Sequence, residues 1–452
     1  MSEIPSPPIG PGTPSGGASN SSTPPIDLGP RTLLVLSLPA IAIGLISAVV
    51  LFALDELAHF LQDFLWETVP GWVGVNPDSG WWIFGTLSAT GLAVGLIVAL
   101  VPGHAGRDSA TTELIAPPLP LIALPTLALV AVLGLAGGVS LGPENPIIAI
   151  NTALLVVIVR RIAPRIPSPM VVMLVASGTI GALFGTPVAA ALVFTGIVAA
   201  LKTGGSLFDR LFLPLVSAGA GSITMSMLGS SSATLKLAPL GIPDGFDVGG
   251  SIVIAVGATL VGLALAYALP VLHRLFHALG SPIIFTTLGG MILGILGVIG
   301  GPITLFKGAQ QSEELLANAS SYSLGALVLM VVVKILALLI AASSGFRGGR
   351  IFPAVFISVD LGLIAHVLLP DVPLGLAIAS ATLGLVLAVA RDGWLALFLA
   401  VAIVGDATVL GVLCIAVLPA WLLVSRAPEM IVRPPQPPVN PSAPPATSAA
   451  AA

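Results

Sequence analysis

One carboxylate between helix-breaking residues has the clearest capacity for chemistry in this sequence. Glu144 stands in the segment Gly142-Pro-Glu-Asn-Pro146, between the apolar runs Leu121 to Val139 and Ile147 to Val159. A carboxylate at membrane depth costs about 2.5–3.5 kcal/mol on insertion scales, so such residues usually line a pathway. The flanking prolines interrupt the helix and place Glu144 beside freed backbone amides, an arrangement with which transporters hold anions. The segment therefore predicts ion movement and no chemistry on a substrate.

A second segment, Gly349-Arg-Ile-Phe-Pro353, has the same Gly-x-x-x-Pro frame and lies 207 residues further along the chain. Paired broken segments at corresponding places in two halves of a chain indicate a transport site at a repeat interface. We expect the backbone N–H groups of Arg350, Ile351 and Phe352 to point at an anion from a helix N-terminus. Arg350 would add positive charge or pair with Glu144. Two alternatives remain. Glu144 could be a structural acid that caps the following helix or pairs with a nearby arginine, and the segment that ends at Pro353 could be a simple tight turn between packed helices.

A third polar group, formed by His104, Arg107 and Asp108, precedes the short segment Ser109 to Leu114. It could line a vestibule, with amides from Gly106 and Arg107 facing an anion. It could equally be a solvated loop with an Arg–Asp pair, in which Asp108 or the residue after it is an N-cap.

The elements that position these groups must be membrane helices. The 452 residues are 56% hydrophobic and 8% charged, whereas soluble domains average about 25% charged residues. Continuous runs near the ~20 residues that span the hydrocarbon exclude a barrel and predict an all-α polytopic membrane protein. Those runs are Leu33 to Leu54, Trp81 to Val101, Leu121 to Val139, Leu211 to Leu228, Ile252 to Leu269 and Leu324 to Ala342. Shorter or broken runs, which suit half-helices and tilted segments, are Ile147 to Val159, Met170 to Phe184, Val188 to Leu201 and Trp394 to Val404.

Composition also limits cofactors and partners. The single cysteine, Cys414, provides no disulfide and no metal framework. The net charge of −4 gives no reason to expect a nucleic-acid partner. The scarcity of histidines and of paired acids argues against an intramembrane enzyme. We predict no cofactor, no metal and no enzymatic activity, with the lipid bilayer as the surroundings of the protein.

Composition shifts divide the chain into three parts. Residues 1–30 are rich in Pro, Ser and Gly and predict a disordered tail, and residues 428–452 predict a second, Pro/Ala-rich one. Residues 31–427 form one membrane domain, with repeat halves at about 31–230 and 250–427. The basic loop Arg160, Arg161 and Arg165 is expected in the cytoplasm by the positive-inside rule. We predict a multi-pass protein of the cell membrane with cytoplasmic tails.

The motifs resemble those of the CLC chloride channels and proton-coupled chloride transporters. Leu141 to Pro146 is similar to the family's Gly-Arg-Glu-Gly-Pro motif, and Lys334 to Pro353 to the stretch that leads into its Gly-x-Phe-x-Pro loop. Ala176 to Phe194 is similar to a helix pair of the family, and Gly103 to Asp108 sits where it has Gly-Ser-Gly-Ile-Pro. A divergent bacterial subgroup of ion-transport proteins shares HAG-x-D, SLGPE-x-P and SGFRGGRIFP. The resemblance covers 31–427.

The resemblance implies a fold, an assembly and a substrate class. The fold would be an inverted repeat of tilted and partly spanning helices. The protein would be a homodimer with one pore per subunit, carrying chloride or another small anion, and Glu144 would be the gating glutamate.

Departures from the family bear on mechanism. Ala105 stands where the family has an anion-coordinating serine, and its coordinating tyrosine has no counterpart, since Tyr267 and Tyr322 lie elsewhere. The inner glutamate that relays protons would fall near 195–197, where there is no acid. Ile351 occupies the aromatic position of Gly-x-Phe-x-Pro. We therefore predict anion conductance gated by Glu144 with weak or no proton coupling. The alternatives are a selective fluoride or other small-anion carrier, a proton/chloride exchanger with a different proton route, and a non-conducting membrane scaffold.

The predicted site has one gate, a set of backbone anion ligands and a set of motif residues. The gate is Glu144. The anion-binding positions are Ala105, Gly106, Arg107, Glu144, Asn145, Arg350, Ile351 and Phe352. The motif glycines and prolines are Gly142, Pro143, Pro146, Gly348, Gly349 and Pro353.

Overall fold

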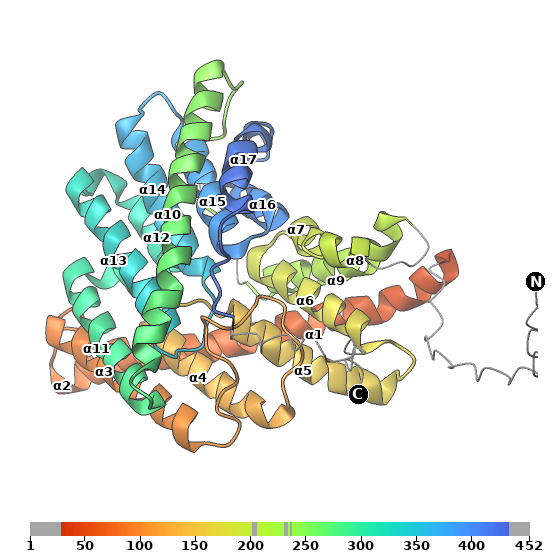
Figure 1. Cartoon of the computed structure of the whole chain (residues 1–452), viewed down its shortest axis with the longest axis horizontal. Helices are drawn as coiled ribbons and strands as arrows, with labels where there is room; N and C mark the ends of the chain where they lie inside the picture. The colour runs from red at the N-terminus through yellow and green to blue at the C-terminus, as the bar shows by residue number, and fades with distance from the viewer. Residues whose placement is uncertain (1–28, 201–205, 230–233, 236, 434–452) are drawn as a thin grey trace, which may run out of the picture.

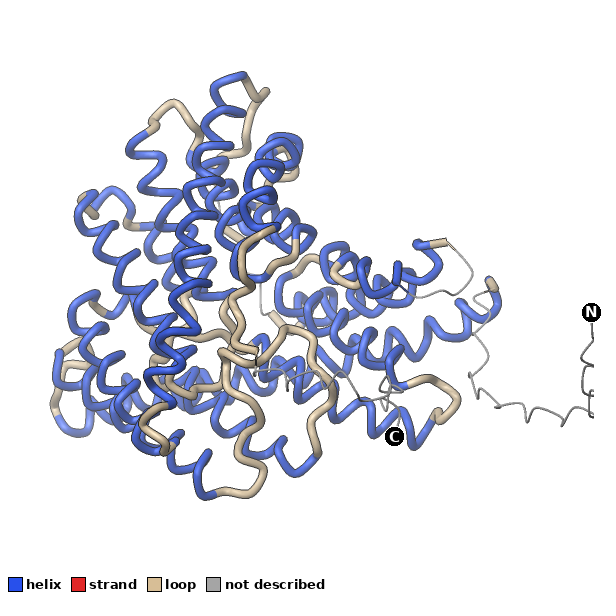
Figure 2. Tube along the Cα trace, viewed as in Figure 1, coloured by secondary structure: helices blue, strands red, loops and turns tan. Residues whose placement is uncertain are grey.

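The computed structural model describes residues 29–200, 206–229, 234–235 and 237–433. Within these ranges every regular element is a helix, and one isolated β-bridge joins Gly142 to Gly349 (Figure 2). The predicted all-α class is confirmed. Most of the predicted N-terminal tail and residues 434–452 of the C-terminal one lie outside the described residues.

The first half of the chain forms the helices drawn in red to yellow-green in Figure 1. They are α1 (Pro30–Asp63), the π-helical turn η1 (Phe64–Thr68), α2 (Val69–Val73), α3 (Gly80–Leu100), η2 (Leu121–Ala123), α4 (Leu124–Ala136), α5 (Glu144–Ile162), α6 (Ser168–Phe184), α7 (Pro187–Leu192), α8 (Thr195–Ala200) and α9 (Leu207–Met227).

The second half forms the helices drawn in green to blue (Figure 1). They are α10 (Gly245–His277), α11 (Pro282–Gly300), η3 (Pro302–Thr304), α12 (Ala309–Ala317), η4 (Ala319–Ser321), α13 (Leu324–Ser343), α14 (Ile351–Leu368), α15 (Leu374–Ala390), α16 (Gly393–Val404) and α17 (Val409–Ser425).

The order and packing of the helices repeat between the halves. The long helix α1 packs on α6 and α9, and the long helix α10 packs in the same way on α15 and α17. The two halves meet where α3 packs along α11. Glycines permit that close approach, since a Cβ at Gly91 would lie 2.6 Å from the carbonyl oxygen of Thr286. Small residues that let backbones touch are the usual packing device between membrane helices.

Seven helices of the described part are long and apolar enough to cross a membrane. They are the continuous stretch Pro30–Val73 and helices α3, α5, α10, α11, α13 and α14. The protein is therefore a multi-pass membrane protein. The prediction of a half-helix at 147–159 is wrong, because α5 has 19 residues. Its proline, Pro146, lies in the first turn, where the missing N–H group costs the helix nothing.

Four helix ends meet in the interior of the molecule. Helix α4 ends at Ala136 and α13 at Ser343, and after short turns α5 begins at Glu144 and α14 at Ile351. Figure 2 shows loops running through the middle of the molecule between such ends. The N–H of Gly142 donates to the carbonyl of Gly349 at 2.9 Å, and the N–H of Gly349 donates back at 2.7 Å. This reciprocal pair fixes the two Gly-x-x-x-Pro segments against each other.

Candidate functional site

The carboxylate of Glu144 lies at the N-terminus of helix α14. Its Oε1 accepts hydrogen bonds from the backbone N–H groups of Ile351, at 2.6 Å, and Phe352, at 3.3 Å. The side chain is fully buried, and its second oxygen, Oε2, has no hydrogen-bond partner. The first N–H groups of a helix have no partner within the helix and attract negative charge. Glu144 from one half of the chain thus occupies an anion position built by the other half.

Two motif glycines make the room for this carboxylate. A Cβ placed on Gly349 would lie 1.9 Å from Cδ of Glu144, and one on Gly142 would lie 2.0 Å from its Oε2. Real Cβ contacts do not come this close, so only glycine fits at either position while Glu144 points inward. The glycines of the two Gly-x-x-x-Pro segments therefore leave space for the Glu144 carboxylate and also permit the backbone turn.

Arg350 does not form the direct pair with Glu144 that the sequence suggested as one option. Its guanidinium donates to the backbone carbonyls of Thr112, at 3.2 Å, and Met430. Burial lowers the pKa of Arg350 to about 10, against the opposing charges of Glu144 and Asp108, so it remains charged at neutral pH. It acts on Glu144 as a nearby positive charge. Its own backbone N–H has no recorded bond to the carboxylate, whereas those of Ile351 and Phe352 do.

The loop at 103–106 differs from the prediction of free amides. The N–H of Ala105 donates to Oγ1 of Thr126 at 3.2 Å, and that of Gly106 to the carbonyl of Gly103 at 3.2 Å. Both amides therefore already have acceptors, one in helix α4 and one within the loop. Four consecutive residues, 103–106, have positive φ, including 48° at His104 and 52° at Ala105. The left-handed conformation costs about 1–2 kcal/mol at a non-glycine residue, so the loop needs an external support.

Arg347, which sequence reasoning missed, supplies that support. Its guanidinium donates to the carbonyls of Ala105 at 3.0 Å, His104 at 3.2 Å and Gly106 at 3.0 Å. It also donates to the carbonyl of Gly345 in its own loop. The planar fork of an arginine suits several acceptors at fixed angles. The only sequence signal was an arginine in a glycine-rich segment of an apolar chain, since such an arginine must find acceptors wherever the fold brings them.

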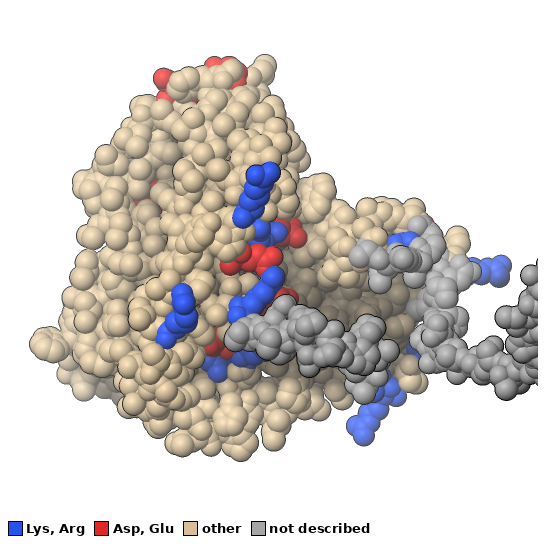
Figure 3. Space-filling model, viewed as in Figure 1, with Lys and Arg blue, Asp and Glu red and all other residues tan. Residues whose placement is uncertain are grey.

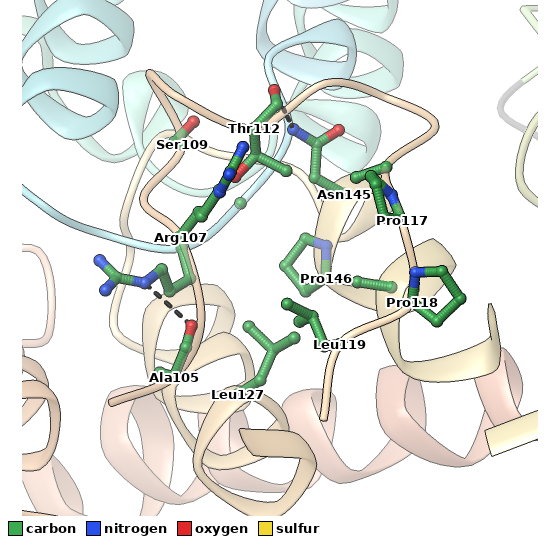
Figure 4. A pocket seen from close by; sticks show the side chains of 14 residues that line it. Ala105, Arg107, Ser109, Thr112, Pro117, Pro118, Leu119, Leu127, Asn145 and Pro146 are labelled. Atoms are coloured by element: carbon green, nitrogen blue, oxygen red, sulfur yellow. Dashed lines mark hydrogen bonds between the residues drawn. The ribbon is translucent and has the colours of Figure 1, made fainter. Parts of the chain in front are cut away.

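A cavity of about 220 Å³ lies beside this loop and reaches the start of α5 (Figure 4). Its charged lining residues are Arg107 and Arg347, with no acid among them. In Figure 4, Thr112 and Asn145 lie at one end, and Leu119 and Leu127 at the other. Asn145 follows Glu144 directly, so the cavity approaches the buried carboxylate from one side. Figure 3 shows many of the charged side chains of this face gathered near its centre.

A second cavity approaches from the other side. It has about 30 Å³ and is lined by Phe352 together with Phe184 and other apolar residues. The rings of Phe184 and Phe352 stack at 5.4 Å between centroids. Each cavity is lined by a neighbour of Glu144: Asn145, the next residue, lines the basic cavity, and Phe352, whose amide bonds the carboxylate, lines the apolar one.

In the described residues, the hydrogen bonds that reach the Glu144 carboxylate come from backbone amides, those of Ile351 and Phe352 among them. Tyr267 is 60% exposed on α10, whereas Glu144 is fully buried. In α8, where the inner acid was missing, Thr195 bonds the carbonyl of Leu192. A different acid, Asp360 in α14, is fully buried, and neither of its carboxylate oxygens has a hydrogen-bond partner.

Asp108 pairs with histidines, so the predicted Arg–Asp pair within the loop is wrong. Its Oδ2 lies 3.0 Å from Nε2 of His273 and 3.2 Å from Nε2 of His277. Burial alone would raise the pKa of Asp108, but hydrogen bonds from both histidines and Thr111 and the charge of Arg347 hold it well below its ordinary value. The carboxylate is therefore ionised at neutral pH.

The described start of the predicted C-terminal tail is packed on the site. The N–H of Val432 donates to the carbonyl of Ala110 at 2.8 Å, and the carbonyl of Met430, a buried residue, accepts from Arg350. The chain just past the boundary predicted at 427 therefore contacts the loop after α3 and the start of α14.

Comparison with known proteins gives matches along most of the chain. Residues 90–425 match the family described as "Voltage gated chloride channel". A relative from Escherichia coli (strain K12 / DH10B), named "Putative ion-transport protein YfeO", is 47% identical over 408 residues, covering 90% of this chain and 96% of the relative.

Solved structures share the fold. A slow cyanobacterial Cl⁻/H⁺ antiporter has a TM-score of 0.73 at 19% identity, covering 88% of this chain and 95% of that one. A CLC-type fluoride/proton antiporter has a TM-score of 0.64 at 19% identity, covering 88% and 97%. At such identities these likenesses bear on the fold alone, and they confirm the architecture expected from the sequence.

Proposed function

The chain belongs to the voltage-gated chloride channel family, and on that premise we propose that it moves a small anion, chloride by default, along a pathway gated by Glu144. The observation that carries the proposal is the Glu144 carboxylate on the amides of Ile351 and Phe352. A helix N-terminus with free amides binds anions without a buried cation. An anion at this point and the carboxylate would compete for the same two donors, so the pathway conducts when Glu144 leaves.

The surroundings of Glu144 support a route through this point. A basic cavity next to Asn145 would collect anions, because Arg107 and Arg347 line it without a neutralising acid. The apolar cavity at Phe352 would form the far side of the route. The amides of Ile351 and Phe352 and the start of α5 are then the anion-binding groups of the proposal. The loop at 105–107 contributes the cavity wall, and its charge comes from Arg107.

We propose that this anion movement has weak or no proton coupling. Thr195 and its neighbours offer no acid at the position where the family's exchangers carry one. A proton could then reach Glu144 only through water or through a different acid.

A specific observation supports proton-coupled exchange as a second candidate. Asp360 is buried on α14, the helix whose N-terminus holds Glu144, and neither of its oxygens has a partner. Intramembrane acids of this kind are typical of proton relays. The two solved structures compared above are of proton antiporters by name. Under this candidate Asp360→Asn would abolish proton movement while anion movement persists.

The anion, the assembly and the orientation are part of the same proposal. Fluoride is the alternative substrate, since neither a serine nor a tyrosine side chain reaches the amides that would select an anion. A homodimer in the cell membrane with cytoplasmic tails follows from the family and from the basic loop at 160–165. The mass of the protein in detergent and the accessibility of tail labels in intact cells would test the last two.

The deciding experiment measures anion efflux and proton movement together in liposomes. Wild-type protein is compared with Glu144→Gln and with Glu313→Gln, which removes a charge from an exposed side chain of α12. We expect efflux of chloride or fluoride that rises in Glu144→Gln by at least about tenfold, because a neutral amide loses the charge-assisted bonds to the helix N-terminus. Glu313→Gln should behave as wild type.

Two other outcomes would change the proposal. Uphill proton movement driven by an anion gradient would establish exchange and direct attention to Asp360. Folded protein that releases no small anion in either form would overturn the proposal and favour a non-conducting scaffold.

A further inference from the structure

Three side chains outside the Glu144 site place their ligand atoms around one point. His273 and His277 are four residues apart, on one face of α10 near its C-terminal end, and both direct Nε2 toward Oδ2 of Asp108. The three ligand atoms all lie within 4.8 Å of one another. Figure 1 shows this end of α10 beside the loop that follows α3. Segments far apart in sequence thus bring two imidazoles and a carboxylate together.

The spacing matches the edges of a metal tetrahedron. Bonds of about 2.0–2.2 Å from Zn²⁺ to imidazole nitrogen and carboxylate oxygen imply ligand atoms roughly 3.3 Å apart at tetrahedral angles. The two distances from Asp108 Oδ2 are 3.0 Å and 3.2 Å. The rings of the two histidines stack at 3.8 Å between centroids with their planes 26° apart, so a shared ion requires the rings to turn until both in-plane lone pairs meet it.

The Nδ1 contact of His277 leaves its Nε2 for the carboxylate. Its Nδ1 lies 3.0 Å from the carbonyl oxygen of His273. A carbonyl only accepts, so Nδ1 carries a proton. The 3.2 Å contact between Nε2 and Oδ2 of Asp108 then holds either a second proton, on a charged ring, or a metal ion that takes the place of that proton. A backbone carbonyl on Nδ1 is also the usual outer contact of a metal-binding histidine.

The carboxylate is held for this task by its own loop. Oδ1 of Asp108 accepts from the N–H of Thr111 at 2.9 Å and from its Oγ1 at 2.6 Å. Oδ2 remains for the histidines. The side chains of Asp108 and His273 are 11% and 12% exposed, and that of His277 is 34% exposed. Water can reach the point from the side of His277 and would complete the coordination shell.

Two positive charges oppose a cation here. Arg350 acts on Asp108 by its charge, and Arg347 acts on both Asp108 and His277. The guanidinium of Arg347 is turned to the carbonyls of the loop 104–106, which offset part of its charge. On the other face of His277 the ring of Phe285 stacks at 4.5 Å. Phe285 brings no charge to the cluster.

We propose that Asp108, His273 and His277 form a binding site for a divalent transition-metal ion of the zinc class. Imidazole and carboxylate ligands suit this class, whereas Mg²⁺ and Ca²⁺ prefer oxygen ligands alone. The bound ion joins the end of α10 to the loop whose neighbouring residues, Arg107 and Ser109, line the basic cavity. A bound metal ion therefore stabilises the wall of the basic cavity, so the shape of the proposed anion route depends on whether the ion is bound.

The test is metal binding to the full chain, which does not depend on whether the protein transports anions. Protein freed of metal with a chelator is titrated with Zn²⁺ and with Mg²⁺, and its thermal unfolding is followed. We expect one Zn²⁺ per chain, an unfolding temperature that rises with Zn²⁺ concentration as mass action requires, and no response to Mg²⁺. Zn²⁺ affinity should fall by at least about tenfold between pH 7 and pH 5.5, because protons displace the ion from imidazole.

Variants identify the ligands. His277→Ala and His273→Ala should each weaken Zn²⁺ binding by at least about tenfold. His366→Ala, at a histidine of α14 that bonds the carbonyl of Val372, should not. If the α10 variants fail to fold, Co²⁺ added to wild type gives the answer, since tetrahedral Co²⁺ with nitrogen ligands absorbs visible light. A wild-type protein that binds no Zn²⁺ stoichiometrically and shows no Co²⁺ band would overturn the proposal, and so would binding that survives both histidine substitutions.

Discussion

The two halves of the molecule build the same backbone at the point where they meet, and they put unlike groups on it. Gly142 and Gly349 exchange hydrogen bonds, and a helix begins two residues after each of them. The first residue of that helix is Glu144 in one half and Ile351 in the other. One half therefore supplies a charge and the other supplies the bare amides that receive it. The two halves share the backbone geometry, and the residue that differs between them is the proposed gate, Glu144.

The halves also differ in how their interior loops are held. After α3, the left-handed loop at 103–106 is bound by the guanidinium of Arg347 and borders a cavity. After α11, the carbonyls of residues 304–306 surround the ammonium of Lys334, whose side chain has no exposed surface. Arg347 and Lys334 both belong to the second half of the chain. The loop at 103–106 is thus hydrogen-bonded to its cation at the wall of the basic cavity, whereas residues 304–306 are bonded to theirs in the buried core.

The largest effect is expected where residues 304–306 lose their cation. Lys334 donates all three of its ammonium protons, to Thr304 at 2.9 Å, Leu305 at 3.0 Å and Phe306 at 2.8 Å. Lys334→Met leaves three carbonyls without that donor, so the free energy of unfolding should fall by about 3–5 kcal/mol. Thermal unfolding in detergent measures the loss.

The control uses the other lysine that the structure pairs. Lys307 bonds Asp55 at 2.6 Å near the surface, and Lys307→Met should cost about 1 kcal/mol or less. Equal losses in the two variants would mean that Lys334 contributes no more than an ordinary ion pair, and the contrast between residues 304–306 and the loop at 103–106 would fail.

The next effect is expected at the glycines that admit the carboxylate. In Gly349→Ala the new Cβ takes the place of the Glu144 side chain, because its three nearest atoms all belong to that side chain. Glu144 should swing away and lose a charge-assisted bond worth about 1.5–3 kcal/mol, which is roughly a tenfold or larger shift toward the open pathway. Anion efflux from liposomes should rise accordingly.

A double substitution separates release of the gate from general damage. Once Glu144→Ala has removed the side chain, adding Gly349→Ala should change efflux little, because nothing remains to clash. Gly134→Ala, at a helical glycine with open space around it, should resemble wild type. A Gly349→Ala effect that persists without Glu144 would show that the glycine serves the backbone alone.

Sequence reasoning singled out Glu144 because a carboxylate is anomalous at this place in the chain. A carboxylate between prolines in an apolar chain has few explanations, and the second Gly-x-x-x-Pro frame indicated its counterpart. The same reasoning missed Arg347, because its acceptors are carbonyls of a loop 242 residues away at Ala105 and carbonyls leave no sequence signal. It also missed the histidine cluster, since His273 and His277 read as the polar end of a helix until the fold brings Asp108 to them.

The predicted helix lengths show the same limit. Pro146 was treated as a break, yet a proline in the first turn starts a helix as well as it ends one. The choice depends on where the preceding chain goes, and here Gly142 is fixed by Gly349 from the other half. The local sequence pattern therefore predicts that a segment is helical, whereas the residue at which the helix begins depends on hydrogen bonds to distant parts of the chain.

A smaller effect is expected from Arg350, whose charge acts on Glu144 without a direct bond. Its guanidinium holds the carbonyls of Thr112 and Met430. Arg350→Gln should lower anion efflux by roughly two- to threefold at low ionic strength and less in 0.5 M salt, since distant charges are screened. The response to Glu144→Gln should persist in this background. A complete loss of efflux would instead place Arg350 among the groups that bind the anion.

The smallest effect is expected from removing every tyrosine. The chain has two, Tyr267 and Tyr322, and the first is 60% exposed on α10. If the anion is held by the amides at the start of α14, the double variant Tyr267→Phe/Tyr322→Phe should transport at the wild-type rate with unchanged anion preference. A measurable loss would mean that a phenol reaches the pathway after all, through a subunit interface or a second conformation. In that case the charge of Glu144 from one half and the amides of α14 from the other would not account for the whole site.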